Sequence, residues 1–184
     1  NLHLLKYDSV HGTLTDEIKE IDSNKFEINK KQIKKFSSKV PEDLPWAELN
    51  IDLVLECTGK FNDKKLSYQH IEAGAKRVLI SAPAKDVDIT AVFGVNHMEI
   101  KSEHSVISNA SCTTNALAPL VKALNDTLGI ETAFMTTIHS YTGDQPTLDR
   151  NHKDLYRARS AAQSIIPTST GAAISLGEVI PELM

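Results

Sequence analysis

The sequence has few of the residues that staple small secreted domains or cross membranes. Its 184 residues include only two cysteines, Cys57 and Cys112, which give neither a disulfide framework nor zinc-ligand spacing. No apolar run approaches the roughly 20 residues that span a bilayer. The formal net charge is −4 and no basic block stands out, so neither nucleic acid nor a membrane is expected as a partner. These absences favour a cytoplasmic location without a metal site.

What the sequence does contain is an alternation of strand and helix patterns. The predicted elements are a helix over 2–7, a hairpin of 26–29 and 32–36, strands over 51–57, 77–81 and 105–108, and helices over 64–74 and 115–128. In the 64–74 helix, Leu66, His70, Ile71 and Ala73 are expected to face the core, and Gly74 to cap it. Cys57 fits a buried core position. Strands alternating with helices of this length favour a parallel sheet and the α/β class.

Cys112 is the strongest candidate for a reactive side chain. It falls at a strand-to-helix junction, between the small hydroxyl residues Ser111 and Thr113. Free N–H groups and the positive dipole end of a helix start stabilise an anion, so a lowered pKa is expected for a thiol placed there. The alternative is a small buried cysteine flanked by residues that only cap the helix.

His139 is the candidate partner of that thiol. Residues 132–139 are expected to form a strand that delivers His139 at its end. A cysteine–histidine pair is the usual way to activate a thiol, because imidazolium stabilises thiolate and neutral imidazole accepts protons. The alternative is a histidine packed in the core. The other histidines are read as surface or packing residues: His3, His11, His70, His97, His104 and His152.

Five segments occur in an order and spacing that match a known family. They are residues 4–12 (LLKYDSVHG), 80–84 (ISAPA), 107–115 (ISNASCTTN), 136–142 (TTIHSYT) and 166–173 (IPTSTGAA). Together they resemble the glyceraldehyde-3-phosphate dehydrogenase family, whose active-site signature resembles the third segment. The G-x-G-x-x-G turn that opens the family's first domain has no counterpart here, so the resemblance implies an internal fragment of a longer enzyme.

The resemblance implies a fold and an activity. The fold would be α/β, a partial Rossmann-type dinucleotide-binding domain over 1–111 followed by the start of an α+β catalytic domain over 112–184. The activity would be the phosphorylating oxidation of glyceraldehyde 3-phosphate to 1,3-bisphosphoglycerate with reduction of NAD, a step of glycolysis. The partners would be this substrate and inorganic phosphate, and the complete protein would be a cytoplasmic homotetramer.

The resemblance also assigns roles to individual residues. Cys112 would form a thiohemiacetal and then a thioester with the substrate, and His139 would take up the hydroxyl proton. The residues that it implies for substrate and phosphate binding are Ser111, Thr113, Thr142, Asp144, Arg157, Thr170 and Gly171. Asp144 would position an arginine that lies outside this sequence. Taken alone, Arg157 is equally compatible with a surface ion pair.

The cofactor assignment follows the ends of the predicted strands. The implied cofactor-lining residues are Lys39, Thr58, Gly59, Phe61, Ser81 and Ala82. Without the resemblance, the small residues among them would be read as tight turns. Lys39 departs from the family, which often has arginine there. Arg150 lies where NAD-using and NADP-using members differ, so NAD is expected and NADP stays open.

Two alternatives remain beside this function. Erythrose-4-phosphate dehydrogenase shares residues 111–115 and the histidine segment, although residues 167–173 argue against it because that enzyme usually alters this loop. The second alternative is a non-catalytic interaction module, since the dinucleotide-binding turn has no counterpart in the sequence.

Overall fold

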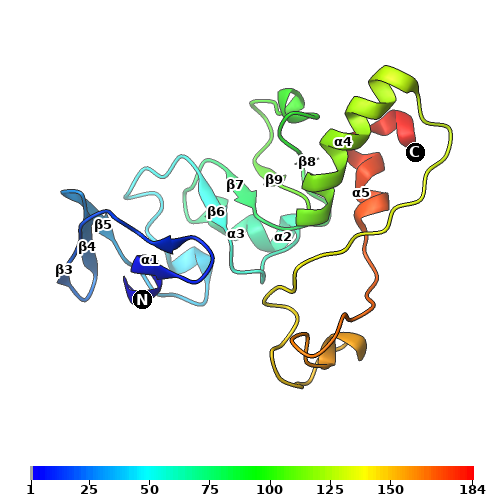
Figure 1. Cartoon of the computed structure of the whole chain (residues 1–184). Helices are drawn as coiled ribbons and strands as arrows, with labels where there is room; N and C mark the ends of the chain where they lie inside the picture. Colours follow the sequence, from blue (N-terminus) through cyan, green and yellow to red (C-terminus); the bar gives the residue numbers. More distant parts are fainter. Residues whose placement is uncertain (1) are drawn as a thin grey trace.

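The computed structural model describes residues 2–184 and confirms the α/β class, with a parallel sheet at its centre (Figure 1). The sheet has the strand order β6–β7–β9–β8, and every neighbouring pair is parallel. Its strands are β6 (Val54–Glu56), β7 (Val78–Ile80), β8 (Ile89–Thr90) and β9 (Val106–Ser108). Because parallel strands end at the same edge, the segments after β6, β7 and β9 gather there, where ligands bind in open α/β sheets.

The main core packs against this sheet and explains which face of the helices that follow β6 is buried. The fully or nearly buried apolar side chains are Val54, Ala75, Val78, Ile80 and Val106. The predicted 64–74 helix is two short helices, α2 (Lys64–Ser67) and α3 (Gln69–Glu72). Their inward face is Ser67 and His70 with half-buried Ile71, at i, i+3 and i+4. Leu66 precedes that face by one residue and is exposed, so its predicted core position is wrong.

Gly74 ends this helical segment as predicted, with a φ of +103°. A Cβ at this position would lie 2.5 Å from the Cβ of Ala47. Glycine is therefore required both by the backbone conformation and by the close approach of the neighbouring chain.

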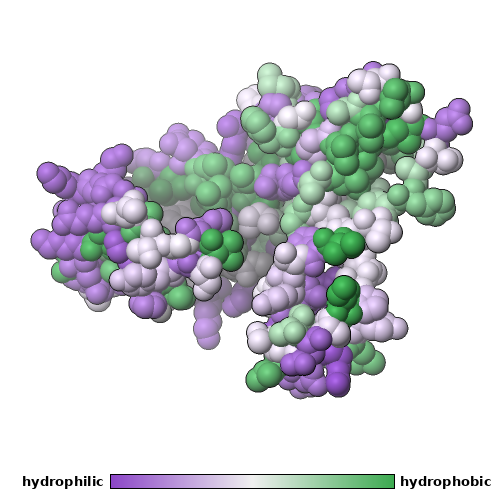
Figure 2. All heavy atoms as spheres, viewed as in Figure 1, coloured by the Kyte–Doolittle hydropathy of each residue, from purple (hydrophilic) through white to green (hydrophobic). Residues whose placement is uncertain are grey.

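A second core joins α4 (Cys112–Leu128) to α5 (Ala172–Val179). Its buried members are Val92, Ala110, Ala118, Val179 and Ile180. The predicted 115–128 helix is confirmed and begins three residues earlier, at Cys112. Both helices begin at the same end of this layer (Figure 1). The outward side of α4 exposes Leu120, Leu124 and Leu128, and apolar surface gathers over this helix in Figure 2.

The N-terminal part, residues 2–34, forms a short helix and strands of its own and has a largely hydrophilic surface (Figure 2). It comprises α1 (Leu2–Lys6), β1 (Tyr7–Asp8), β2 (Gly12–Thr13), β3 (Ile18–Asp22), β4 (Lys25–Ile28) and β5 (Lys31–Lys34). Strands β3, β4 and β5 form an antiparallel sheet. The predicted hairpin is confirmed, and its two-residue turn has positive φ at both Asn29 and Lys30, as a type I′ turn requires. Strand β3 was not predicted.

Residues 130–171 form no strand, so the strand predicted over 132–139 is wrong. A strand requires a neighbour to hydrogen-bond its backbone, and no described segment pairs with these residues. Phe134 and Ile138 point into solvent. The short helices in and around the remaining loops are η1 (Pro41–Asp43), η2 (His97–Glu99), η3 (Tyr156–Ala158) and η4 (Pro181–Leu183).

Strand β6 buries the opposite face from the one its hydrophobic residues suggest. Val54 and Glu56 point inward, whereas Leu53 and Leu55 are 47% and 62% exposed. Cys57 is exposed as well, so its predicted core position is wrong. The alternation of side chains along a strand places all three of these residues on one face. Within residues 2–184, no helix is long and apolar enough to cross a membrane.

Candidate active site

Cys112 sits on a backbone that is fixed from the strand side. Ser108, the last residue of β9, donates its hydroxyl to the Ala82 carbonyl at 2.8 Å and accepts from the Ala110 N–H at 3.1 Å. Ala110 has a φ of +56°, a left-handed conformation that turns the chain sharply. The strand β9 therefore leads directly into the start of α4.

The helix side of the junction is fixed by capping. The Ser111 hydroxyl accepts the Thr114 N–H at 2.9 Å, as an N-cap residue does. The Asn115 amide donates to the carbonyls of Asn109 and Ser111 at 2.7 and 2.9 Å. Cys112 is consequently the first residue of the helix, near the positive end of its dipole, and it is exposed.

The structure brings His139 to this thiol. The His139 Nε2 lies 3.2 Å from the Cys112 Sγ, and its Nδ1 lies 2.6 Å from the Ser140 carbonyl. A carbonyl oxygen only accepts, so Nδ1 carries a proton and donates it. Nε2 is then free to accept a proton from the thiol or, once protonated, to donate to the thiolate.

The electrostatics of the pair favour the thiolate of Cys112 and the imidazolium of His139. Desolvation opposes ionisation of Cys112, but the hydrogen bond from His139, its charge, and hydrogen bonds from Thr113 together lower the pKa of the thiol. The Ser140 carbonyl first, then the hydrogen bond and charge of Cys112, raise the pKa of His139. The two shifts widen the pH range over which thiolate and imidazolium coexist.

A cavity of about 660 Å³ adjoins His139 and is lined mainly by residues 136–141 and 161–168. Thr170 lines it as well, and its hydroxyl accepts the Ala172 N–H at 3.2 Å. Gly171 is the N-cap residue of α5. Thr170 and Gly171 therefore lie at a helix start beside the cavity that His139 lines, where free N–H groups favour an anion.

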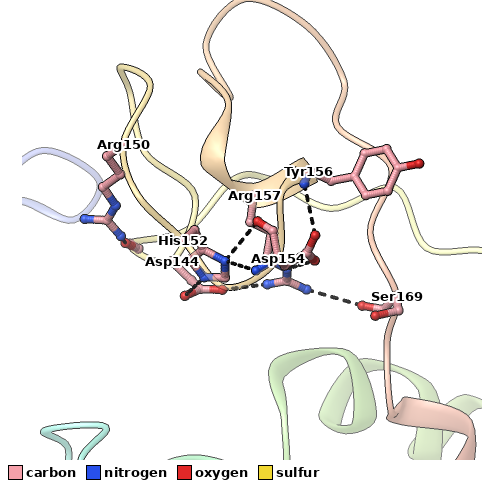
Figure 3. Close-up of polar contacts among 8 residues, drawn as sticks. Asp144, Arg150, His152, Asp154, Tyr156, Arg157 and Ser169 are labelled. Atoms are coloured by element: carbon pink, nitrogen blue, oxygen red, sulfur yellow. Dashed lines mark hydrogen bonds and ion pairs between the residues drawn. The ribbon is translucent and has the colours of Figure 1, made fainter.

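Asp144, His152 and Arg157 form a connected polar cluster (Figure 3). Asp144 accepts from the Arg157 guanidinium at 2.7 Å and from His152 Nε2 at 3.1 Å. These two hydrogen bonds, that of His152 first, lower the pKa of Asp144. The guanidinium also donates to the Ser169 carbonyl at 3.2 Å, next to Thr170. Arg157 thus ties the 141–157 loop to the segment that carries Thr170.

Thr142 and Arg150, named in the sequence analysis, and the nearby Arg159 make local contacts. Thr142 is exposed, and its carbonyl accepts the Gln145 N–H at 2.9 Å. Arg150 donates to the Gly143 carbonyl at 3.2 Å. Arg159 pairs with Asp149 at 3.1 Å on the surface, where such pairs contribute about 0–1 kcal/mol.

All the predicted cofactor residues except Lys39 follow the carboxyl ends of β6 and β7, which are paired in register. Gly59 has a φ of +71°, and apart from its chain neighbours no heavy atom lies within 4 Å of where its Cβ would be. This turn is therefore open to the close approach of a ligand. Ser81 is exposed and Ala82 half-buried after the neighbouring strand. A turn without a Cβ at a strand end suits the close approach of a dinucleotide. Lys39 is exposed in the loop before η1.

Glu56 is a buried ionisable residue that the sequence reasoning missed. Its carboxylate accepts from Thr58 and contacts His70 at 3.1 Å. The available signal was a glutamate within a predicted buried strand, two residues before the Thr58–Gly59 turn. Among residues 2–184, no group of three or more His, Cys, Asp or Glu side chains is arranged to hold a metal ion.

Comparison with known proteins adds to this geometry. Residues 1–64 match the family model for the NAD binding domain of glyceraldehyde 3-phosphate dehydrogenase, and residues 111–184 match that for its C-terminal domain. The chain belongs to the glyceraldehyde 3-phosphate dehydrogenase family. This confirms the predicted family and the predicted fold class, a dinucleotide-binding domain followed by catalytic-domain sequence.

Curated relatives agree along the whole chain. A glyceraldehyde-3-phosphate dehydrogenase of Xanthobacter flavus is 56% identical over 183 residues, and a plasmid-encoded one of Cupriavidus necator is 53% identical over 184 residues. Each match covers 100% of this chain and 54% of the relative. A chloroplastic form from Chlamydomonas reinhardtii is 56% identical over 98% of the chain and 49% of the relative. The chain thus spans about half the length of the curated relatives it matches.

Proposed function

We propose that the complete protein catalyses the phosphorylating oxidation of glyceraldehyde 3-phosphate to 1,3-bisphosphoglycerate with reduction of NAD. The observation that carries this proposal is the 3.2 Å contact between Cys112 and His139 at the start of α4. Family membership supplies the substrate class. The pair supplies a nucleophile and a proton carrier, which aldehyde oxidation through a thioester requires.

The first half-reaction uses the charged form of the pair. The Cys112 thiolate adds to the aldehyde carbon, and the imidazolium of His139 gives its Nε2 proton to the new oxygen, which forms a thiohemiacetal. Bound NAD would supply the acceptor for the hydride that leaves that carbon. His139 takes the hydroxyl proton back as the carbonyl of the thioester forms. The hydrogen bond from Nδ1 to Ser140 keeps the imidazole aimed at the reacting atoms throughout.

The second half-reaction releases the acyl group. An oxygen of inorganic phosphate attacks the thioester carbon, the Cys112 thiolate leaves, and the phosphate proton passes to solvent. Thr170 and Gly171, with Ser111 and Thr113, would bind the attacking phosphate. A hydrogen bond to such a charged group contributes about 1.5–3 kcal/mol.

The substrate's own phosphate would bind on the side of Thr142, Asp144 and Arg157. The contacts of Asp144 support a modified role for it. It accepts from the Arg157 guanidinium, which also donates to the Ser169 carbonyl, next to Thr170. Within this sequence, Arg157 is therefore the arginine that Asp144 orients.

The remaining expectations belong to the same proposal. NAD would lie along Thr58, Gly59, Phe61, Ser81 and Ala82, with Lys39 near the adenosine, and the domain boundary would fall between residues 111 and 112. The complete protein would act as a cytoplasmic homotetramer in glycolysis.

The direct test is NADH formation by the full-length protein with glyceraldehyde 3-phosphate, NAD and phosphate. We expect turnover that requires phosphate and is lost in Cys112→Ser. Erythrose 4-phosphate as the preferred substrate would favour the sister activity. The absence of NADH formation with either aldehyde would favour a non-catalytic module.

A further inference from the structure

A chain of hydrogen bonds, buried at its two central members His70 and Glu56, runs from half-buried Trp46 to the exposed turn after β6. The Trp46 indole Nε1 lies 3.1 Å from His70 Nδ1, and His70 Nε2 lies 3.1 Å from Glu56 Oε2. Glu56 Oε1 accepts both the N–H and the hydroxyl of Thr58, at 2.7 and 2.5 Å. The side chains of His70 and Glu56 are only 6% and 3% exposed. The proposed chemistry at Cys112 uses none of these groups.

The direction of every hydrogen bond in the chain is fixed by its first member. An indole N–H can only donate, so Nδ1 of His70 must accept and carries no proton. The ring proton therefore sits on Nε2 and is donated to Glu56. Glu56 in turn accepts at both oxygens, from His70 on one side and Thr58 on the other. A buried network with every member satisfied specifies a single arrangement.

This network supports both ends of the turn that the proposed function gives to the cofactor. Thr58 is anchored to Glu56 by two hydrogen bonds. Phe61 packs edge-on against the His70 ring, with centroids 5.9 Å apart, and its carbonyl accepts the Ser67 hydroxyl at 2.6 Å. Gly59 lies between these anchors in its open, positive-φ conformation. A turn fixed before binding costs less ordering entropy when the ligand arrives.

We propose that Glu56 is a positioning residue of the dinucleotide site: His70, itself held by Trp46, donates to Oε2, so that Oε1 is left to accept from the Thr58–Gly59 turn. The identity of the ligand rests on the proposed function, whereas the direction of the hydrogen bonds does not. A packing role would need only a side chain of this size and shape. The positioning role needs an acceptor at both oxygens.

Glutamine at position 56 separates these two roles because it keeps the shape and replaces one acceptor by a donor. If its NH₂ faces Thr58, the hydroxyl can turn to accept from it, but the Thr58 backbone N–H meets a second donor. If its NH₂ faces His70, the imidazole must move its proton to Nδ1, where it meets the indole N–H of Trp46. Glu56→Gln alone therefore always leaves one conflict. Adding Trp46→Phe removes the indole donor and lets His70 adopt the other tautomer.

The experiment measures NAD binding by calorimetry on the full-length protein with and without these substitutions. We expect Glu56→Gln to weaken NAD binding about tenfold, in line with the cost of an unsatisfied buried donor. The double variant Glu56→Gln/Trp46→Phe should bind more tightly than the single variant. The matched control Glu48→Gln, at an exposed position outside the network, should bind like the unaltered protein.

A Glu56→Gln variant that binds NAD like the unaltered protein, or a double variant weaker than the single one, would overturn the proposal. If Glu56→Gln does not fold, His70→Gln and His70→Leu replace it. The glutamine side chain can still donate to Glu56, so the His70→Gln variant should bind NAD more tightly than the His70→Leu variant. The reverse order would overturn the proposal.

Failure of the proposed function has a different signature. An unaltered protein that does not bind NAD would overturn the NAD-dependent function and, with it, the ligand assigned here. The network itself is then read from the indole N–H resonance that disappears in Trp46→Phe. We expect this proton to exchange faster in Glu56→Gln than in the unaltered protein. Equal exchange rates would overturn the directed network as well.

Discussion

The two members of the proposed catalytic pair come from regions built on opposite principles. Cys112 belongs to residues 51–128, where a parallel sheet and α4 fix the backbone through ladders, caps and a buried core. His139 belongs to residues 130–171, which contain no strand and are held by isolated polar contacts such as that of Arg157 with Asp144 (Figure 3). Cys112 is placed by regular structure, and His139 by a loop.

This difference indicates which substitutions should disturb the proposed chemistry and which should lower stability. The environment of Cys112 at a helix start survives local change because many backbone hydrogen bonds define it. The position of His139 depends on one backbone contact, to Ser140, and on the cysteine itself. Loops held by few contacts open at lower free-energy cost than packed strands. Loss of a loop contact should therefore affect chemistry more than stability, whereas loss of a helix cap at the junction should lower stability.

The largest effect is expected from His139→Asn. Asparagine cannot carry a proton to and from the substrate oxygen, so the oxidative step should slow by about 10²–10⁴. Pre-steady-state NADH formation measures this step, with His11→Asn as a control at an exposed histidine outside the proposed site. Unchanged oxidation in the His139 variant would make this residue a bystander.

A smaller and more selective effect is expected from Thr170→Ala. The hydroxyl would bind the attacking phosphate only after oxidation, so phosphate-dependent thioester release should slow by about 10–100-fold, the equivalent of one charge-assisted hydrogen bond. Single-turnover kinetics should show an intact NADH burst followed by slow turnover. A uniform loss in both phases would mean that Thr170 only supports the start of α5, where its hydroxyl accepts the Ala172 N–H.

The smallest effects compare the two regions directly. Ser111→Ala removes the N-cap of α4 and should lower the free energy of unfolding by about 1 kcal/mol. Arg159→Gln breaks an exposed ion pair of the loop region and should change it by less than about 1 kcal/mol, since such pairs contribute little. Denaturant titration measures both. A larger loss from Arg159→Gln would contradict the contrast between the regions.

The same contrast explains what the sequence could predict. Helix α4, the strands β6, β7 and β9 and the hairpin of β4 and β5 follow from periodicity and turn residues, because local patterns determine them. The strand expected over 132–139 failed, since an apolar segment becomes a strand only beside a partner, which no described segment provides. In β6, hydrophobicity suggested a buried Leu55, yet the structure buries Glu56 instead.

The candidate site divides in the same way. Cys112 was predicted from its place at a helix start, which is a local property. The pairing of Arg157 with Asp144 and Ser169 was not, because it joins side chains across a loop without periodicity. Glu56 was missed because a buried carboxylate is recognised by its partners. Those partners, Thr58 and His70, meet it only in the folded chain.

The central claim is that Cys112 and His139 form a thiolate–imidazolium pair, and alkylation by iodoacetamide against pH tests it most directly. Thiolate is the reactive form, so the labelling rate of each cysteine rises as pH passes the pKa of its thiol. The pKa of Cys112 is lowered, so it should reach half its maximal rate below the pH of about 8.5 that an ordinary thiol needs. Cys57, also exposed, is the internal reference.

Peptide mass spectrometry resolves the two sites in one sample of the full-length protein. We predict that Cys112 is labelled far faster than Cys57 between pH 6 and 7, and that His139→Asn moves its half-maximal rate to higher pH. Equal labelling of Cys57 and Cys112 across this range, or a Cys112 profile that His139→Asn leaves unmoved, would contradict the pair.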